Sequence, residues 1–221
     1  MIEVHHLNNS RSQRVLWLLE ELGREYKVVK YERDPDTLLA PPELRRIHPL
    51  GKSPVIRDHG HTIAESGTII EYLIDRYGDG RLRPLRGTEA YLRYLYWMHY
   101  AEGSAMPPLL LKLVFTRMPK ARVPGVLRPL VRAIAQRAQK TFIDPQVATH
   151  LRYWDDELGA HEWFAGAEFT AADIQMSFPA EAAASRAGIE LGRNVKRFLG
   201  RIHTRPAYQR ALQVGGAYQL Y

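Results

Sequence analysis

Two short polar segments have residue types that could hold a small zwitterionic ligand. In Lys52-Ser53-Pro54-Val55 the proline cannot donate to a β-ladder, so it interrupts strand pairing at a sheet edge. If the Ser53–Pro54 bond is cis, the amide and carbonyl of Val55 turn outward and can pair with an extended peptide-like ligand. Glu65-Ser66 then opens an amphipathic segment and places a carboxylate and a hydroxyl at a helix N-terminus, where free N–H groups attract a ligand carboxylate. Together the two segments predict a site for a small zwitterionic peptide.

The residues before these segments alternate between strand and helix patterns. Residues 2–7 alternate apolar and polar side chains as a strand does, and Asn8-Asn9-Ser10 has the chemistry of a turn and a helix N-cap. Apolar residues at helical spacing fill 15–22, and Gly23 closes this helix. A second strand is expected over 26–31.

The same alternation continues through the two polar segments. A short helix is expected from Pro41 to about His48, because the residue before Pro49 avoids helical angles. Residues 55–57 and 62–64 are predicted strands around the hairpin signal Asp58-His59-Gly60, and a helix is expected over 66–77. The order β-α-β-α-β-β-α predicts an α/β layer of thioredoxin type.

Beyond residue 77 the pattern changes to helices only. Residues 77–89 are rich in Gly, Arg and Pro and are expected to form a linker. Prolines at 107–108, 119–124 and 145 are expected to break the helices that follow, and Thr170-Ala171-Ala172-Asp173 is a capping box. We therefore predict a thioredoxin-like α/β domain in residues 1–80 and an all-α domain in residues 88–221.

Composition limits the classes of function. The chain has 221 residues, 45% of them hydrophobic, and no cysteine, which excludes disulfides and thiolate metal sites; no metal site is expected. No apolar stretch approaches the roughly 20 residues of a membrane span, and the N-terminus lacks a signal-peptide pattern, so a cytoplasmic location is expected. The net charge of +7 comes from basic residues that look dispersed, which favours solvated helix faces and a small anionic substrate over nucleic acid.

Six segments resemble the cytosolic glutathione transferases, in particular a serine-type branch found in fungi and bacteria. These segments are residues 10–17 (SRSQRVLW), 48–55 (HPLGKSPV), 64–67 (AESG), 170–174 (TAADI) and, for the branch, 40–44 (APPEL) with 100–104 (YAEGS). The resemblance covers nearly the whole chain. It implies glutathione as co-substrate and a homodimer.

The resemblance also assigns roles to the two polar segments. Ser53 and Val55 match the cis-proline turn that pairs with the cysteinyl part of glutathione, and Glu65-Ser66 match the pair that holds the γ-glutamyl group. Lys52 matches a basic residue that reaches the glycyl carboxylate, with His48 as a weaker candidate. Thr170 and Asp173 match a structural folding box. Residues 1–80 are therefore expected to bind glutathione.

Catalysis would require a group that stabilises the glutathione thiolate. A thiol has a pKa near 8.5, and lowering it by about two units requires roughly 2.7 kcal/mol, which one charge-assisted hydrogen bond supplies. Ser10 is the expected catalytic donor, because it lies between the first strand and the first helix, where serine-type members carry their hydroxyl. Ser12 and Asn9 are alternative donors, and a simple N-cap is the alternative role for Ser10; Asn9 is in either case expected to contact glutathione.

The second substrate is expected between the first turn and the helical domain. The predicted pocket residues are Asn8, Tyr100, Ser104, Met106 and Leu110, with Phe115 as a further candidate and Tyr218 or Tyr221 as a cover. Glu102 could meet the glutathione amine across a dimer interface or form a salt bridge. Without cysteine, the expected reaction is conjugation of glutathione to small hydrophobic electrophiles or reduction of peroxides. A scaffold that binds partners without turnover, and a basic RNA-associated module, are the alternatives.

Overall fold

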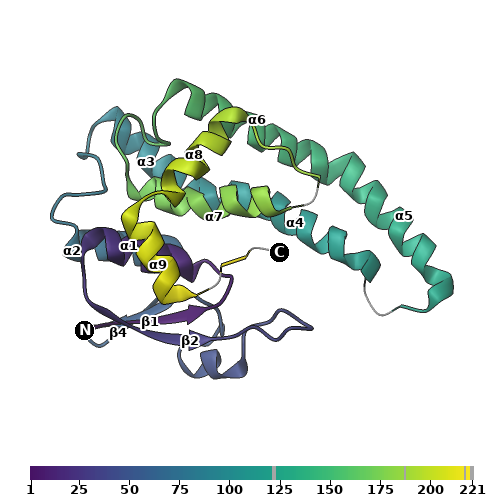
Figure 1. The fold of residues 1–221 in the computed structure, drawn as a ribbon, viewed down its shortest axis with the longest axis horizontal. Coiled ribbons are helices and arrows are strands. Elements are labelled where there is room, and N and C mark those ends of the chain that lie inside the picture. Colours follow the sequence, from purple (N-terminus) through teal and green to yellow (C-terminus); the bar gives the residue numbers. More distant parts are fainter. Residues whose placement is uncertain (121–122, 187, 217, 220–221) are drawn as a thin grey trace.

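The first 77 residues form strands and helices in the predicted order (Figure 1). We analysed a computed structural model, which describes residues 1–120, 123–186, 188–216 and 218–219. The elements are β1 (Ile2–Leu7), α1 (Ser12–Leu22), β2 (Tyr26–Tyr31), a 3₁₀ helix (Pro42–Arg46), β3 (Val55–Asp58), β4 (His61–Ala64) and α2 (Ser66–Tyr77). The predicted thioredoxin-like α/β layer is thus confirmed.

The four strands form one mixed sheet in the order β2-β1-β3-β4. β1 is parallel to β2 and antiparallel to β3, and β3 is antiparallel to β4. The register places His5 opposite Val55 and Val55 opposite Ala64. The end of β1, the start of β3 and the end of β4 therefore meet at one edge of the sheet, where the two predicted polar segments also lie.

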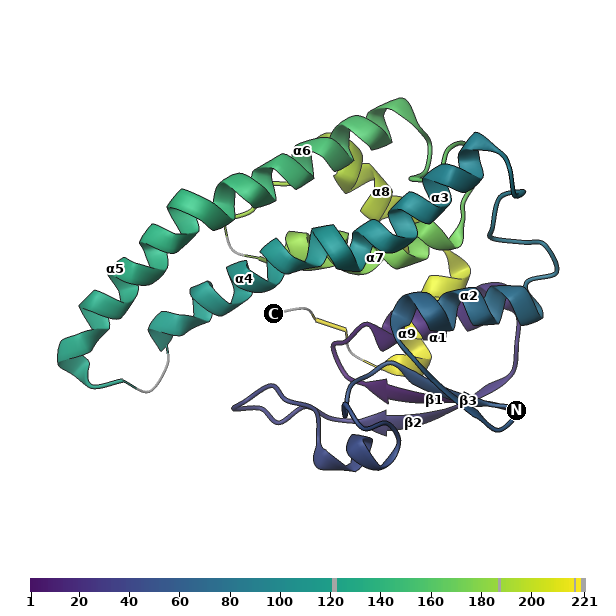
Figure 2. The ribbon, with the colours of Figure 1, turned by 180° about the vertical axis from the view of Figure 1, so that it is seen from behind.

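Helices α1 and α2 pack side by side on one face of the sheet, and α9 (Pro206–Gly215) lies against α1 (Figure 2). The stripe of leucines and Val15 in α1 is buried, as its helical spacing predicts. Gly23 ends the helix in the left-handed conformation, with φ of 64°. These contacts fix the direction in which α1 begins, and so the position of the turn before it.

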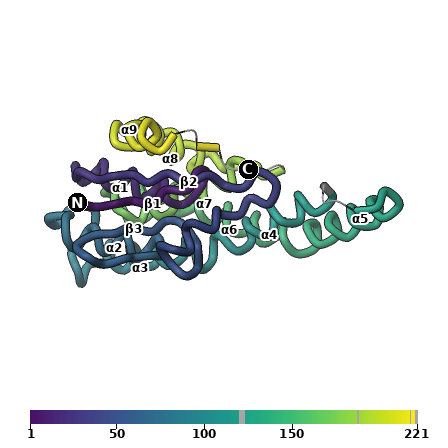
Figure 3. The backbone as a smooth tube through the Cα atoms, turned by 90° about the horizontal axis from the view of Figure 1, so that it is seen from below, coloured from purple at the N-terminus to yellow at the C-terminus, as the bar shows by residue number. Residues whose placement is uncertain are grey.

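The rest of the chain is helical, which confirms the predicted all-α part. Its further helices are α3 (Glu89–Tyr100), α4 (Met106–Arg117), α5 (Arg128–Ala138), α6 (Asp144–Ala160), α7 (Ala171–Ser185) and α8 (Arg193–His203). Two π-helical turns, Ala101–Ala105 and Gln139–Ile143, join α3 to α4 and α5 to α6. The prolines at 107 and 145 follow these π-helical turns, and Ala105 and Ile143 before them keep helical angles, so the expected breaks at these two positions are wrong. Helices α4 and α5 extend together beyond the rest of the molecule (Figures 1 and 3).

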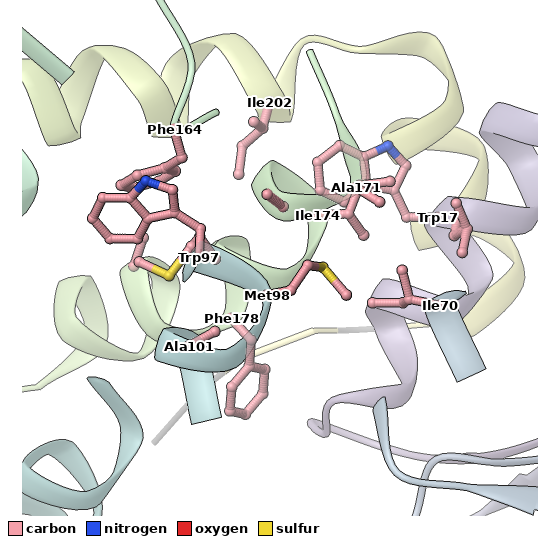
Figure 4. Close-up of a cluster of buried hydrophobic side chains, with 14 of the residues drawn as sticks. Trp17, Ile70, Trp97, Met98, Ala101, Phe164, Ala171, Ile174, Phe178 and Ile202 are labelled. Atoms are coloured by element: carbon pink, nitrogen blue, oxygen red, sulfur yellow. The ribbon is translucent and has the colours of Figure 1, made fainter. Parts of the chain in front are cut away.

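Helix α7 is the centre of the core, with every residue from Ala171 to Ala183 buried. Figure 4 shows its Ile174 among side chains from α1, α2, α3 and α8, including Trp17 and Met98. The predicted capping box starts this helix: Asp173 accepts hydrogen bonds from the N–H groups of Thr170 (2.8 Å) and Phe164 (2.9 Å). Burial raises the pKa of Asp173 to about 7, although these N–H donors act to lower it. Both box residues are deep in the helical part and have a structural role.

A charged cluster joins the start of α1 to the helical part. Arg14 is fully buried and donates to the backbone carbonyl of Gln175 and to the carboxylate of Glu102. Arg11 donates to both oxygens of Glu102 at 2.9 Å, and its guanidinium lies 4.7 Å from the ring centre of Phe178. Of the two roles expected for Glu102, the described structure contains the salt bridge.

The pKa of Glu102 makes this cluster testable. Burial acts to raise that pKa, but the charges of Arg14 and Arg11 lower it from 4.5 to about 2. A depressed carboxyl pKa contributes stability that is present above pH 4.5 and is lost as the pH falls towards 2. The free energy of unfolding, measured by urea titration at several pH values, should therefore fall more steeply over this range in wild type than in Glu102→Gln.

The exposed carboxylate Glu168 provides the control. Glu168→Gln should keep the wild-type pH profile, because it leaves the two guanidinium groups paired. Parallel profiles for wild type and Glu102→Gln would show that the ion pairs do not contribute to stability.

Candidate active site

The turn before β3 has the geometry that presents a backbone to a ligand. The Ser53–Pro54 bond is cis, as the interpretation of Val55 required. The Ser53 hydroxyl donates to the carbonyl of His5 at 2.9 Å and accepts from the N–H of Leu7 at 3.2 Å. Ser53 thereby fastens the turn to the end of β1, and Val55 follows as the first residue of β3.

Glu65 lies at the N-terminus of α2 in an unusual backbone conformation. Its φ of 69° and ψ of 124° are unfavourable for a residue with a side chain, at a cost of order 1–3 kcal/mol. Its side chain is exposed, its carbonyl accepts from Ile69 at 2.9 Å, and Ser66 is the buried first residue of the helix. In this conformation the acidic side chain of Glu65 points into solvent, beside the N–H groups at the start of α2.

The two basic candidates near the cis-proline turn differ in their surroundings. Lys52 is exposed next to Ser53, so its ammonium group can extend towards an anionic ligand at this edge. His48 is half-buried, and its Nδ1 accepts from the N–H of Leu50 at 3.4 Å within the local turn. The geometry therefore favours Lys52 over His48.

The turn after β1 contains two asparagines with different partners. Asn8 accepts from the backbone N–H of Arg33 at 2.9 Å through its side chain, and from the Arg33 Nε at 3.2 Å through its carbonyl. Asn9 has a left-handed φ of 48° and accepts, through Oδ1, from the N–H of Gln219 at 2.7 Å. Asn8 thus joins the turn to the segment after β2, whereas Asn9 lies half-exposed beneath the C-terminal tail.

Ser10 and Ser12 belong to a buried chain of hydrogen bonds that ends at His6. The Ser10 and Ser12 hydroxyls lie 2.8 Å apart, and Ser12 Oγ is 2.9 Å from His6 Nδ1. Burial, with Lys30, lowers the pKa of His6 to about 4, so the ring is neutral at pH 7. Its other nitrogen bonds to the backbone of Gly215, which leaves Nδ1 as an acceptor.

This chain bears on the direction of the Ser10 hydroxyl hydrogen. Where Ser12 donates to His6 Nδ1 or to the carbonyl of Leu7 at 3.2 Å, Ser10 donates to Ser12. Ser10 also accepts from the Ser12 N–H at 3.2 Å, the first N–H of α1, whereas the N-cap position itself is occupied by Arg11. With Ser10 only 2% exposed, the geometry points away from the expectation that it donates to a thiolate.

The predicted pocket residues do not all lie together. Tyr100 is 7% exposed and stacks among aromatic side chains, where its oxygen accepts from Trp154 Nε1 at 2.9 Å and bonds to His150. Tyr100 packs in the helical core and Asn8 is hydrogen-bonded to Arg33, and the assignment of both to the pocket stays a prediction. Met106 is buried, Phe115 is half-buried, and Ser104 and Leu110 are exposed.

The C-terminal tail crosses the first turn through contacts that the sequence analysis missed. Tyr218 donates from its hydroxyl to Glu181 at 2.9 Å, and Glu181 also accepts from Tyr208 at 2.6 Å. Gln219 follows and meets Asn9. Tyr218 is thus held beside the turn, and its role as a cover stays a prediction, whereas Tyr221 lies outside the described residues. No local pattern signals these contacts, because the bonded residues are 37 and 210 positions apart.

Comparison with known proteins places this site in a family. Residues 1–75 match the model described as "Glutathione S-transferase, N-terminal domain". The chain is 37% identical to glutathione S-transferase 3 of Schizosaccharomyces pombe, covering 94% of this chain and 85% of that one. It is 32% identical to glutathione S-transferase 1 of Saccharomyces cerevisiae, over 84% and 82% of the two chains.

A solved structure agrees with these sequence relationships. The glutathione S-transferase of Actinobacillus pleuropneumoniae superposes with a TM-score of 0.82 at 32% identity, over 99% of this chain and 94% of that one. The order of elements, the cis-proline turn and the capping box are the features that its sequence resemblance predicted. The chain therefore belongs to the glutathione S-transferase family.

Proposed function

We propose that this protein is a glutathione transferase that binds glutathione at the sheet edge and transfers its thiolate to small hydrophobic electrophiles. The observation that carries the proposal is the convergence of four groups on that edge. These are the cis-proline turn, the start of β3, the outward Glu65 carboxylate at the N-terminus of α2, and the Asn9 turn. Glutathione is an extended, zwitterionic peptide, so it matches a backbone edge flanked by an acid and a base.

The glutathione atoms are assigned by charge and geometry. The backbone of Val55 pairs with the cysteinyl residue, since it follows the cis bond. Glu65 accepts from the γ-glutamyl amine, while Ser66 and the first N–H groups of α2 hold the adjoining carboxylate. Lys52 pairs with the glycyl carboxylate. Each charged end of the ligand thus meets a group of opposite charge.

We assign stabilisation of the thiolate to Asn9. The Ser10 and Ser12 hydroxyls donate within the buried chain to His6, so neither directs its hydrogen to a ligand. The Asn9 amide accepts from Gln219 through its oxygen, and its nitrogen is the end of the group that has donors. One hydrogen bond to a charged acceptor contributes about 1.5–3 kcal/mol, which is the scale required to ionise a thiol at neutral pH.

The electrophile would approach between the Asn9 turn, the tail residue Tyr218 and the exposed side chains of Ser104 and Leu110. A hydrophobic acceptor suits this position, and the same thiolate could reduce a peroxide. We further propose that the protein is a cytoplasmic homodimer that acts in detoxification. A non-catalytic scaffold of the same fold is the alternative that the experiments below distinguish.

The assignment of Asn9 predicts different outcomes for two neighbouring substitutions. Asn9→Ala should raise the pKa of bound glutathione by about 1–2 units and lower turnover about 10- to 100-fold, because a charge-assisted hydrogen bond is lost. Ser10→Ala should keep the thiolate and instead lower the free energy of unfolding by about 1 kcal/mol, since a buried hydrogen bond disappears. Ultraviolet titration of the bound thiolate and urea unfolding measure the two effects.

Calorimetry on each variant shows whether glutathione still binds. Loss of the thiolate signal in Ser10→Ala, with glutathione bound and the signal kept in Asn9→Ala, would return the donor role to Ser10. Failure of the wild-type protein to bind glutathione would favour the scaffold.

Because Glu65 has a positive φ, substitutions at this position can separate two quantities. One is the contribution of its side chain to glutathione binding, and the other is the free-energy cost of its backbone conformation. Glu65→Gln should weaken glutathione binding about tenfold or more, because the partner of the ligand amine loses its charge. Glu65→Gly should weaken binding similarly but be more stable to unfolding than Glu65→Gln by about 1 kcal/mol, since glycine accepts a φ of 69°. Calorimetry and urea unfolding of both variants test this.

A glutathione analogue without the γ-glutamyl amine completes the test as a double-mutant cycle. Wild type and Glu65→Gln should bind the analogue equally, and the exposed Glu25→Gln should behave as wild type with both ligands. If Glu65→Gln weakens binding of the analogue as much as that of glutathione, Glu65 does not contact the amine.

A further inference from the structure

Helices α4 and α5 form an arm, residues 106–143, that extends away from both the sheet and the site (Figure 3). Along α5 only Ala135 is buried, so this helix has little contact with the rest of the protein. A helix that is not held by a core normally presents a polar surface. The surface of α5 is instead both apolar and cationic.

The charge of the arm is of one sign. Between Glu102 and Asp144 the sequence has 41 consecutive residues without an acid, and these include eight of the 31 Lys and Arg residues. The remainder of the chain has 23 basic and 24 acidic residues and is close to neutral, so the arm accounts for the net charge of +7. Lys112 pairs with Asp144 at the base of the arm, at 2.7 Å.

The exposed cations are on and beside α5. Arg128, Arg132, Arg137 and Lys140 are all exposed, and none forms an ion pair with any residue that the structure describes. These four side chains lie within four turns of continuous helix. They produce a local positive potential that no acidic side chain on the arm offsets.

Large aliphatic side chains are exposed between these cations. Leu127, Leu130 and Ile134 are 45%, 59% and 53% exposed, and their i, i+3, i+7 spacing puts them on one side of the helix. Val126, just before α5, is 85% exposed, and Phe142, just after it, is 60% exposed. Such clustering of apolar residues on a monomer surface marks an interaction site.

We propose that α5 and its flanking residues dock on the surface of a bilayer that contains anionic lipid. An amphipathic helix with Lys and Arg beside exposed aliphatic side chains lies in the plane of a membrane, where the apolar groups enter the acyl boundary and the cations meet lipid headgroups. Docking would be peripheral: among the described residues, no helix is long and apolar enough to cross a membrane. The proposal does not depend on the function of the sheet edge.

The same chemistry disfavours two other occupants. A second copy that placed its arm on this arm would bring two acid-free cationic helices together, and like charges repel. Nucleic acid would pair with the arginines but would leave Leu130, Ile134 and Val126 without an apolar partner, and α5 itself offers no aromatic ring for base stacking beside that of the flanking Phe142. A bilayer with anionic headgroups satisfies both the charge and the apolar area.

Vesicle flotation tests the proposal on the full chain. Wild type should float with phosphatidylcholine vesicles that contain about 30% phosphatidylserine, should not float with pure phosphatidylcholine, and should be released by salt. Arg128→Glu combined with Arg132→Glu should lower the partition coefficient at least tenfold, and Leu130→Gln combined with Ile134→Gln should do the same at low salt. Unfolding curves verify that each variant is folded.

Matched variants elsewhere control for total charge and hydrophobicity. Arg193→Glu with Lys196→Glu, exposed on α8, makes the same change in net charge, and Leu39→Gln with Leu85→Gln removes two exposed leucines. Both controls should float as wild type does. The proposal is overturned if wild type does not float at low salt, or if the α8 variant loses flotation as fully as the α5 variant.

Sedimentation velocity and a nucleic-acid titration decide between the other occupants. A change of oligomeric mass in Leu130→Gln/Ile134→Gln, without vesicle binding by wild type, would assign the surface to a second copy. Salt-dependent binding of a single-stranded oligonucleotide, lost in Arg128→Glu/Arg132→Glu and again without flotation, would assign it to nucleic acid. Either result excludes the membrane proposal.

Discussion

The burial of the Arg14 charge is the constraint on which the arrangement of the site depends. A guanidinium removed from water must be compensated by close acceptors, and here these come from Glu102 and the backbone of Gln175. Both acceptors belong to the helical part, whereas Arg14 is in the first turn of α1. The need to pair this one charge therefore holds the start of α1 against α7 and the π-helical turn before α4. The Asn9 turn, residues 8–10, joins β1 to Arg11 and takes its position from the same contact.

The features that the sequence predicted well are those determined by neighbouring residues. The capping box and the order of strands and helices follow from the residue types within a few positions of each one. The helical spacing of the leucines in α1 likewise predicted that these leucines are buried. The cis form of the Ser53–Pro54 bond was implied by the family resemblance, because a Ser-Pro pair alone leaves the isomer open.

The direction of individual side chains could not be predicted in this way. Ser10 has the position and chemistry of a thiolate donor, yet its hydrogen is directed inward because His6, neutral and bonded to Gly215, makes Ser12 a donor. Gly215 is more than 200 residues away in the chain. Tyr100 likewise lies in the core, where its oxygen bonds to Trp154 and His150. In each case a partner distant in sequence determines the direction of the side chain, and no local pattern specifies that partner.

The charge of the arm could be missed for a different reason. The informative pattern in the sequence is a long stretch without acidic residues. Basic residues are spread through the chain, and on that basis they look dispersed; the missing acids between Glu102 and Asp144 are what separate the arm from the near-neutral remainder. The structure then shows that this segment is also the part that projects farthest from the core (Figure 3). The arm is bounded by two acids that are each used in an ion pair, Glu102 with Arg14 and Asp144 with Lys112. The acid-free segment between them therefore begins at the contact that positions the candidate site and ends where the arm rejoins α6, so substitutions on α5 can change the arm's charge without touching the candidate site residues.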